Sequence, residues 1–325
     1  MHAFSFPHRV AELAARVEEW GFAGLLVADS QNLNADIWVE LALAGAATRR
    51  IELGPGVTNP LTRLPAVTAS AAATLQAETG GRAVLGLGRG DSALTQLGMS
   101  PAGTAALERA LVEIQGYLRG EDVSAGGVTS RLRWLAEYDL PKVPVSVAAT
   151  GPRVIAAGAR HAERLDFTVG AETGRLRWAI DTARAAAPGD LSLGAFLNVA
   201  VHPDRAVARD LVRGSTATFA RFATEGAPSD GLSEVTRRGV ERLTSGYERG
   251  RHGEGDAPQA RRLEDEFIDR FAVVGPAEEV SERLLKLAAL GLERVIVVPG
   301  SVDADQALVD ESNARFASEV LPTLG

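Results

Sequence analysis

Residues 83–92 read Ala-Val-Leu-Gly-Leu-Gly-Arg-Gly-Asp-Ser, an apolar run of strand length that passes directly into a glycine-rich, polar turn. Three other apolar runs end in the same way, and amphipathic helical patterns follow each; these runs and their turns are Gly24–Ala28 with Asp29–Gln31, Ile51–Leu53 with Gly54–Pro60, and Val143–Ala149 with Thr150–Arg153. Repeated strand–turn–helix units indicate a parallel sheet. In a closed parallel barrel such turns gather at one end, where functional residues lie.

Eight segments have the composition and length of strands, and helical patterns separate them. They are Ala3–Phe6, Gly24–Ala28, Ile51–Leu53, Ala83–Gly88, Val143–Ala149, Leu165–Val169, Leu191–Val201 and Arg294–Val298. Eight strands that alternate with helices predict an α/β fold of the (β/α)8 TIM-barrel class. An open, doubly wound sheet is the alternative, because a sequence does not show closure.

A long helical stretch interrupts this alternation before the last strand. Its predicted helices are Asp204–Thr224, Leu232–Arg249 and Gln259–Phe271, with a polar, glycine-containing segment at Gly250–Pro258. We therefore predict a single TIM-barrel domain over residues 1–325, in which residues 202–272 form a helical insertion. A second polar segment, Gly120–Arg131, is interpreted as a loop.

Composition restricts the classes of partner. The chain has 325 residues, a net charge of −8 and no cysteine. Its negative charge disfavours nucleic acid, and the lack of cysteine excludes disulfides and thiolate metal sites. With no secretory leader and no apolar run of membrane-spanning length, we expect a cytoplasmic protein without membrane contact. No His-x-His or His-Glu-x-x-His spacing occurs, so we predict no metal site.

The polar turns each allow two interpretations. The alternate glycines of Gly86–Asp91 lack dinucleotide-binding spacing, and they either admit a flat ligand or allow tight strand packing. The two prolines and two glycines of Gly54–Pro60 form either a strained functional turn or a rigid loop. Ala149–Arg153 suits an anion at a helix start, or is a plain helix cap. Asp29, Ser30 and Asp91 lie either at a barrel mouth or at helix caps.

Taken together, these turns resemble the luciferase-like family of flavin- or deazaflavin-dependent oxidoreductases. The residues that carry the family resemblance are Gly54–Pro60, Arg63, Pro65–Ala69 and Gly80–Arg82. Other segments are similar to the methylenetetrahydromethanopterin reductase-like branch; they are Gly86–Ala93, Leu97-Gly98, Leu140–Val145, Ala148–Arg153, Val274–Pro276 and Glu278-Glu279. The resemblance spans almost the whole chain.

The resemblance implies a barrel that binds the deazaflavin coenzyme F420, or FMN, at the carboxyl ends of its strands. It implies a non-prolyl cis peptide bond between Gly56 and Val57, behind the coenzyme ring. The implied coenzyme contacts are Asp29, Gly56, Val57, Thr58, Asn59, Arg89 and Gly90, with Ala149, Thr150 and Gly151 on the phosphate and backbone donors from Val169 and Gly170. The acidic position after the fourth strand corresponds to Asp91, which is our candidate for an acid–base role, and Ser30 is our candidate for a hydrogen bond to the substrate or the ring.

Three hypotheses about function follow. The first is an F420-dependent oxidoreductase that transfers a hydride between the coenzyme and a small organic substrate, in which the coenzyme carries the chemistry. The second is an FMN-dependent monooxygenase. The third is a non-catalytic flavin- or deazaflavin-binding barrel, motivated by Ser30 at a position where related dehydrogenases carry histidine. The resemblance also implies a homodimer.

Overall fold

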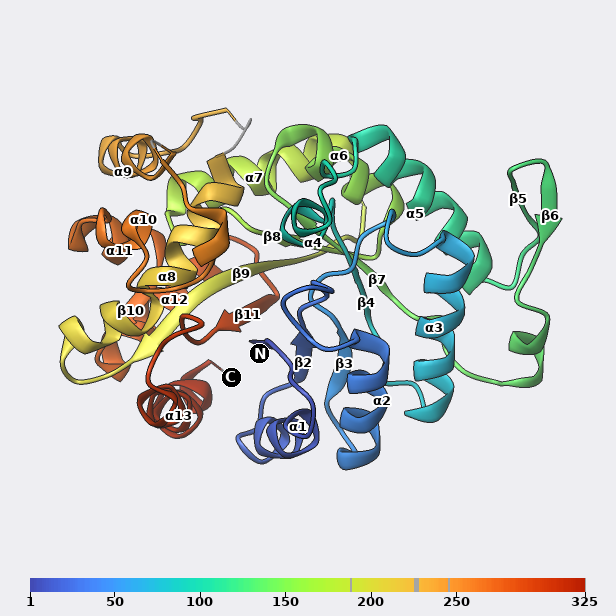
Figure 1. Cartoon of the computed structure of the whole chain (residues 1–325), viewed down its shortest axis with the longest axis horizontal. Helices are drawn as coiled ribbons and strands as arrows, with labels where there is room; N and C mark the ends of the chain where they lie inside the picture. The colour runs from blue at the N-terminus through green and yellow to red at the C-terminus, as the bar shows by residue number, and fades with distance from the viewer. Residues whose placement is uncertain (188, 225–227, 245, 325) are drawn as a thin grey trace. The chain divides into compact units, whose positions relative to one another are not determined.

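The structure is a computed structural model that describes residues 1–187, 189–224, 228–244 and 246–324 (Figure 1). The chain divides into two compact units. The N-terminal unit comprises Met1–Ala148 and Ala157–Leu165, and the C-terminal unit comprises Ala149–Ala156 and Asp166–Gly325.

Short parallel strands form the centre of the N-terminal unit. Strands β1 (His2–Ala3), β2 (Gly24–Val27) and β3 (Glu52–Pro55) form one sheet in that order. Strand β4 (Leu85–Leu87) pairs in parallel with β7 (Val145–Ala149). Isolated bridges at Leu53–Ala83 and Thr58–Leu87 bring the β3 and β4 segments side by side. The turns that follow β3 and β4 are therefore neighbours.

Helices follow each of these strands, as the sequence pattern predicts. They are α1 (Val10–Glu19), α2 (Ile37–Ala47), α3 (Pro65–Glu78), α4 (Asp91–Gln96) and α5 (Thr104–Leu118). Val10, Ala14 and Val17 are the buried stripe of α1, at helical spacing. The carboxylate of Asp36 accepts hydrogen bonds from the N–H groups of Trp38 and Val39 and so caps the start of α2.

Two local predictions for this unit are wrong. The first strand covers His2–Ala3 rather than Ala3–Phe6, and the side chains of Phe4 and Phe6 are exposed. The predicted loop at Gly120–Arg131 contains a hairpin of β5 (Val123–Ala125) and β6 (Val128–Ser130), followed by the short helix η1 (Arg133–Glu137). Gly126 and Gly127 have φ angles of 59° and 80°. A Gly-Gly pair at this position is a hairpin signal that the sequence contained.

Parallel pairing continues in the C-terminal unit. Strand β9 (Ser192–Val201) pairs in parallel with both β10 (Val273–Gly275) and β11 (Arg294–Val298), and β8 (Arg164–Phe167) is its other neighbour in the sheet. Helix α6 (Pro152–His161) begins after β7, and α7 (Thr173–Ala186) follows β8. The long, buried β9 is the centre of this arrangement.

The predicted helical stretch lies between β9 and β10. It contains α8 (Arg205–Thr224), α9 (Glu234–Thr244), the short helix η2 (Arg249–Arg251), α10 (Pro258–Arg261) and α11 (Asp265–Phe271). The predicted helix Leu232–Arg249 ends earlier in the structure, and its position 245 lies outside the described residues. The predicted helix Gln259–Phe271 is two helices, and the three-residue strand β10 was missed, so the helices precede β10 rather than the last strand.

The chain ends with helices. α12 (Ala277–Ala288) precedes β11, and α13 (Gln306–Arg315), a π-helical turn (Phe316–Val320) and a 3-10 turn (Leu321–Thr323) follow it.

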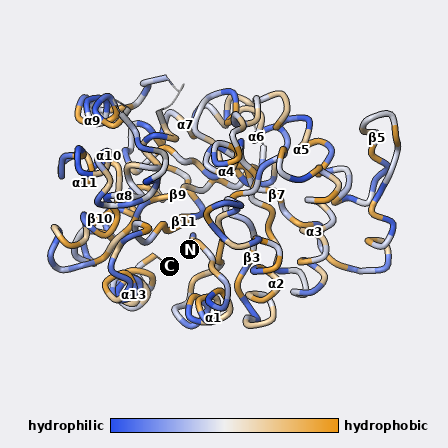
Figure 2. Tube along the Cα trace, in the orientation of Figure 1, coloured by the Kyte–Doolittle hydropathy of each residue, from blue (hydrophilic) through white to orange (hydrophobic). Residues whose placement is uncertain are grey.

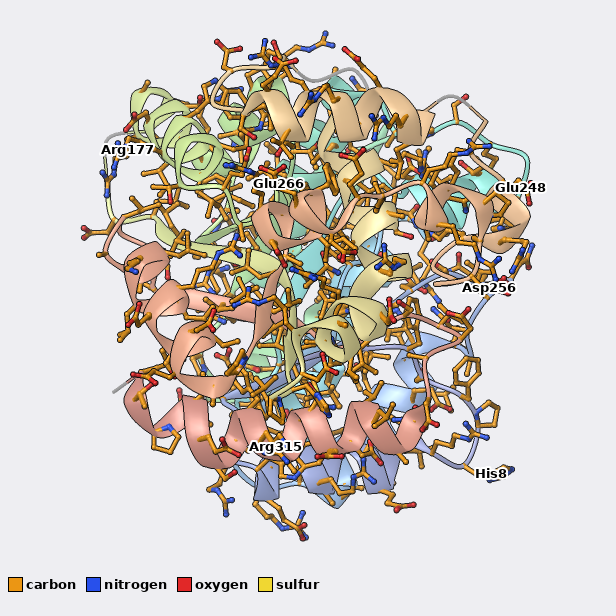
Figure 3. The ribbon with its side chains drawn as sticks, turned by 90° about the vertical axis from the view of Figure 1, so that its left-hand side faces the viewer. His8, Arg177, Glu248, Asp256, Glu266 and Arg315 are labelled. Atoms are coloured by element: carbon orange, nitrogen blue, oxygen red, sulfur yellow. The ribbon has the colours of Figure 1, made fainter. Side chains whose placement is uncertain are left out.

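The residues of β11 are mostly hydrophobic, whereas those of α9 are mostly hydrophilic (Figure 2). Arg315 projects from α13 in Figure 3, and it pairs with Glu311 and Glu319 at 3.0 and 3.3 Å. Such exposed pairs contribute little to stability.

Candidate functional site

A buried carboxylate lies at the end of β2. Asp29 is 3% exposed, and its oxygens accept hydrogen bonds from the Thr58 hydroxyl at 2.6 Å, from Arg63 Nη1 at 2.7 Å and from Gln31 Nε2 at 2.5 Å. Arg63 also reaches Asp36 at 3.0 Å. The segment after β3 therefore supplies two hydrogen-bond partners to Asp29, which follows β2.

Opposing effects act on the acidity of Asp29. Burial raises the pKa of its carboxyl group, whereas the Thr58 hydroxyl and the Arg63 guanidinium both favour the ionised form and oppose that rise. Removing either partner would leave a buried charge with less support. Thr58 and Arg63 thus stabilise the ionised carboxylate of Asp29, one of the predicted site residues.

The segment after β3 contains the backbone feature that the resemblance implied. The Gly56–Val57 peptide bond is cis. The Gly56 carbonyl oxygen accepts a hydrogen bond from His2 Nε2 at 2.8 Å. Burial lowers the pKa of His2 to about 4, so the imidazole is neutral at neutral pH and donates through Nε2. His2 is a contact that the sequence analysis missed.

The alternate glycines of β4 allow close packing. A Cβ atom at Gly86 would lie 2.2 Å from the Pro55 carbonyl oxygen, and one at Gly88 would lie 2.7 Å from Val57 Cγ2. Only glycine permits β4 to approach the β3 segment this closely. Of the two interpretations of these glycines, the structure supports strand packing.

Asn59 presents an unsatisfied buried donor. Its Oδ1 atom accepts hydrogen bonds from the N–H groups of Leu61 and Thr62, both at 3.0 Å. Its Nδ2 atom is buried without a hydrogen-bond partner, and the residue is 0% exposed. The neighbouring Gly90 has a φ of 77°, and a Cβ atom there would lie 2.5 Å from Asn59 Cβ. A buried amide donor without a partner is costly, and it suits a carbonyl group of a bound ring.

The remaining predicted residues of this unit lie around the same turns. Arg89 Nε donates to the Ala102 carbonyl oxygen at 2.6 Å, and Asp91 is the first residue of α4. The Ser30 carbonyl oxygen accepts hydrogen bonds from two backbone N–H groups of its own loop. Asn32 in that loop donates to the Gln96 carbonyl oxygen at the end of α4, at 3.1 Å. The loop with Ser30 and the helix that begins at Asp91 are therefore in contact.

A second group of predicted residues lies in the C-terminal unit. The Ala149 carbonyl oxygen accepts a hydrogen bond from the Thr168 N–H group at 2.9 Å, so the ends of β7 and β8 are side by side. Within the described residues, no hydrogen bond is recorded for the backbone N–H groups of Thr150, Gly151, Val169 and Gly170. Val169 is 1% exposed, and Gly170 is buried as well. Buried N–H groups without a partner are rare, and they suit an anion.

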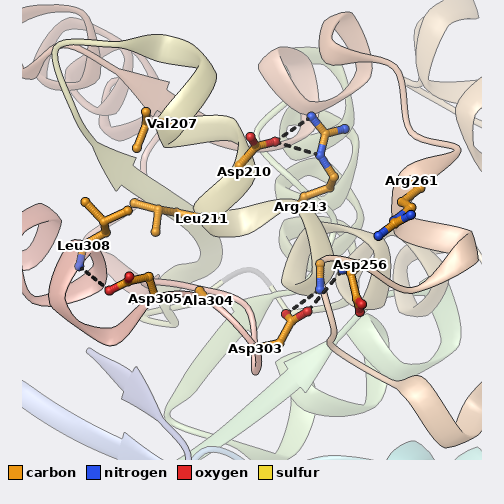
Figure 4. Close-up of a pocket in the computed structure, with 11 residues that line it drawn as sticks. Val207, Asp210, Leu211, Arg213, Asp256, Arg261, Asp303, Ala304, Asp305 and Leu308 are labelled. Carbon is orange, nitrogen blue, oxygen red and sulfur yellow. Dashed lines mark hydrogen bonds and ion pairs between the residues drawn. The ribbon is translucent and has the colours of Figure 1, made fainter.

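A pocket of the C-terminal unit lies apart from these residues. It has a volume of about 530 Å³, lies between α8, the 255–261 segment and α13, and contains none of the predicted site residues (Figure 4). Several carboxylates that line this pocket already have hydrogen-bond or ion-pair partners. Asp303 accepts hydrogen bonds from the N–H groups of Gly255 and Asp256, Asp305 caps α13, and Asp210 pairs with Arg213. These contacts hold loops together.

In the described part of the chain, no cluster of three histidine or acidic side chains has the arrangement of a metal site. No described helix combines the length and the apolar character that a membrane span requires.

Comparisons with known proteins identify the family of the chain. Residues 4–294 match the family model described as luciferase-like monooxygenase. The 5,10-methylenetetrahydromethanopterin reductase of Archaeoglobus fulgidus is 30% identical over 304 residues, which cover 86% of each chain. The F420-dependent glucose-6-phosphate dehydrogenase of Intrasporangium calvum is 28% identical, with 98% of this chain and 95% of that protein covered.

Solved structures share the fold. The coenzyme F420-dependent tetrahydromethanopterin reductase of Methanopyrus kandleri superposes with a TM-score of 0.77 at 20% identity, over 100% of this chain and 98% of that one. The predicted fold class, an α/β barrel fold of the luciferase-like type, is confirmed by this likeness and by the family match.

Proposed function

Because the chain belongs to the luciferase-like monooxygenase family, we propose that it is an F420-dependent oxidoreductase that transfers a hydride between this coenzyme and a small organic substrate. The observation that carries the proposal is the set of backbone N–H groups without a recorded hydrogen bond at Thr150, Gly151, Val169 and Gly170, which fits a phosphate group. Phosphate is common to F420 and FMN. The choice of F420 rests on the names of the curated relatives.

In this proposal, the N-terminal unit holds the coenzyme ring. Asn59 Nδ2, buried and without a partner, donates to a ring carbonyl, and Asp29 contacts the ring or its side chain. The Gly56-Val57-Thr58 backbone supports the ring from behind, and Arg89 and Gly90 complete the contacts. When bound, the coenzyme supplies or accepts the hydride at its ring.

The proposed phosphate contacts all belong to the C-terminal unit. Ala149, Thr150 and Gly151 precede the start of α6, where backbone N–H groups and the helix dipole favour an anion. Val169 and Gly170 follow β8 and add two buried N–H donors. Together they provide four donors on adjacent strand ends.

Two residues of the N-terminal unit have proposed catalytic roles. Asp91 moves a proton to or from the substrate, and Ser30 donates a hydrogen bond to the substrate or to the ring. A serine hydroxyl does not titrate near neutral pH, so Ser30 serves in orientation rather than proton transfer. A reduced pterin is the first substrate to assay, because reductases of such a compound are among the relatives. The cytoplasmic location also remains a prediction.

A titration of the purified protein with F420 and, separately, with FMN tests the proposed function. We expect micromolar or tighter binding of F420 and at least tenfold weaker binding of FMN, measured by fluorescence quenching. Tight binding of FMN alone, with oxygen-dependent turnover, would identify a monooxygenase instead. Binding of F420 without turnover across a panel of reduced pterins, alcohols and sugar phosphates would indicate a non-catalytic binding protein.

We also propose that the protein forms a homodimer through the outer face of α2 and α3. Val39, Leu43, Leu64 and Val67 on or beside these helices are 60%, 48%, 72% and 52% exposed. They flank a shallow, largely apolar depression that Trp38, Ala42, Ala66 and other residues of both helices line. Contiguous apolar surface of this kind is typical of an interface.

Sedimentation equilibrium tests the dimer. We expect twice the chain mass for the wild type. The double variant Val39→Glu with Val67→Glu should have the mass of one chain, because each copy would have to bury two negative charges in the interface. Leu285→Glu, at a residue of α12 that is 45% exposed, is the matched control and should leave the mass unchanged. A wild type with the mass of one chain would contradict the proposal.

A further inference from the structure

Arg283 on α12 hydrogen-bonds to carbonyl oxygens of two other segments. It donates to the carbonyl oxygens of Asp269 and Arg270, near the end of α11, and through Nη2 to the Ala171 carbonyl oxygen at 3.5 Å. The last carbonyl groups of a helix have no partner within the helix, so a guanidinium group satisfies them well. One side chain therefore ties the end of α11 to the turn after β8.

That turn carries the two buried N–H groups proposed for the phosphate. Its conformation depends on α11: the Ala171 N–H group donates to the Phe271 carbonyl oxygen at 2.8 Å. Gly170 has a φ of 80°, and a Cβ atom there would lie 2.6 Å from the Phe271 ring. The Phe271 ring in turn stacks on Phe267, with centroids 5.6 Å apart. The turn thus rests on a packed aromatic pair at the end of α11.

Arg283 brings positive charge to the same place. Desolvation by the surrounding protein lowers its pKa to about 10, which leaves it charged at neutral pH. Its recorded hydrogen bonds within the described residues all go to carbonyl oxygens and none to a carboxylate. Glu172 and Asp269 attract this charge, and Arg205 and Arg270 repel it. A half-buried cation without a hydrogen-bonded counter-ion favours a nearby anion.

We infer that Arg283 is a positioning residue for the phosphate of the coenzyme. It holds the Val169–Ala171 turn against the end of α11, so that the N–H groups of Val169 and Gly170 are preorganised, and it adds positive charge at Ala171, the residue that follows them. This inference rests on the proposed function. It concerns the phosphate-bearing chain of the coenzyme and not its ring.

The test compares two ligands on three variants. The ligands are F420 and the deazaflavin fragment that has the same ring but no phosphate-bearing chain. The variants are Arg283→Met, which keeps an apolar stem, Arg283→Lys, which keeps the charge, and Arg270→Met as the control. Arg270 is exposed, and its side chain pairs with Glu266 of α11, labelled in Figure 3, at 3.1 Å. Dissociation constants and the melting temperature without ligand are measured for each.

We expect Arg283→Met to weaken F420 binding about 30-fold or more while the fragment binds within twofold of the wild type; such a loss corresponds to about 2 kcal/mol. Arg283→Lys should be intermediate, and Arg270→Met unchanged. A purely structural role would weaken both ligands equally, and that result, or unchanged F420 affinity, would overturn the inference. If Arg283→Met fails to fold, Arg283→Lys carries the comparison.

Failure of the proposed function is recognised separately, from the wild type. If the wild type binds FMN and not F420, the same comparison with FMN and riboflavin tests Arg283, because the phosphate is again the difference. If the wild type binds neither phosphate-bearing coenzyme, both the proposed function and this inference are wrong. If the wild type binds F420, but the Arg283 variants lose affinity for both ligands equally or for neither, the inference alone is wrong.

Discussion

Thr150→Glu is expected to abolish binding of the coenzyme. Thr150 is half-buried, its hydroxyl and N–H groups have no recorded hydrogen bond within the described chain, and it lies beside the start of α6. A carboxylate there would repel a phosphate and would itself occupy the free N–H groups. We expect the dissociation constant for F420 to rise at least 100-fold, a change of about 2.7 kcal/mol or more.

The neutral variant Thr150→Gln is the matched control. Its side chain has nearly the size of glutamate but no charge, so we expect no more than a tenfold loss of affinity. Because Thr150 makes no recorded contact that supports the fold, both variants should keep the melting temperature of the wild type within a few degrees. Equal affinities of the glutamate variant and the wild type would show that the phosphate binds elsewhere.

Gly54→Ala should destabilise the protein severely. A Cβ atom at this position of β3 would lie 1.9 Å from the Val84 carbonyl oxygen. The backbone has little room to move, because Leu53 donates to the Arg82 carbonyl oxygen and accepts from the Val84 N–H group, both at 2.9 Å. We expect the free energy of unfolding to fall by roughly 3 kcal/mol or more, measured by urea denaturation.

Gly103→Ala is the control for this experiment. Gly103 precedes α5 with a φ of −63°, and a Cβ atom there meets no heavy atom within 4 Å. Its free energy of unfolding should therefore change by less than about 0.5 kcal/mol. If Gly54→Ala were as stable as Gly103→Ala, the close approach of β3 and β4 described above would be incorrect.

The strand–turn–helix pattern was sufficient to predict the long elements and a parallel α/β fold, and the family resemblance then favoured a barrel over an open sheet. Each apolar run that ended in a polar turn became a parallel strand, because a strand buried on both faces needs a continuous apolar sequence. The pattern also located Asp29 and Thr58 at neighbouring strand ends. It could not show that their side chains are 2.6 Å apart, because that distance depends on how two turns of the chain pack.

Short elements and distant partners escaped prediction. Strand β10 has three residues, too few for a periodic signal, and pairing with β9 stabilises it. The Gly126-Gly127 pair was a hairpin signal, but the glycine and serine content of the segment led to its interpretation as a loop. Arg283 lies 112 residues from Ala171, and one of many arginines in the sequence does not reveal which carbonyl groups it contacts. The roles of the predicted site residues remain predictions that the titrations test.

Arg63 links the buried carboxylate of Asp29 to the start of helix α2. One of its nitrogens bonds Asp29, and another bonds Asp36, the residue that caps α2. If the proposed dimer forms through α2, a substitution at the start of this helix also changes the surroundings of Asp29, and a substitution of Asp29 also changes the proposed interface. Mass and turnover need to be measured together for any substitution of this guanidinium.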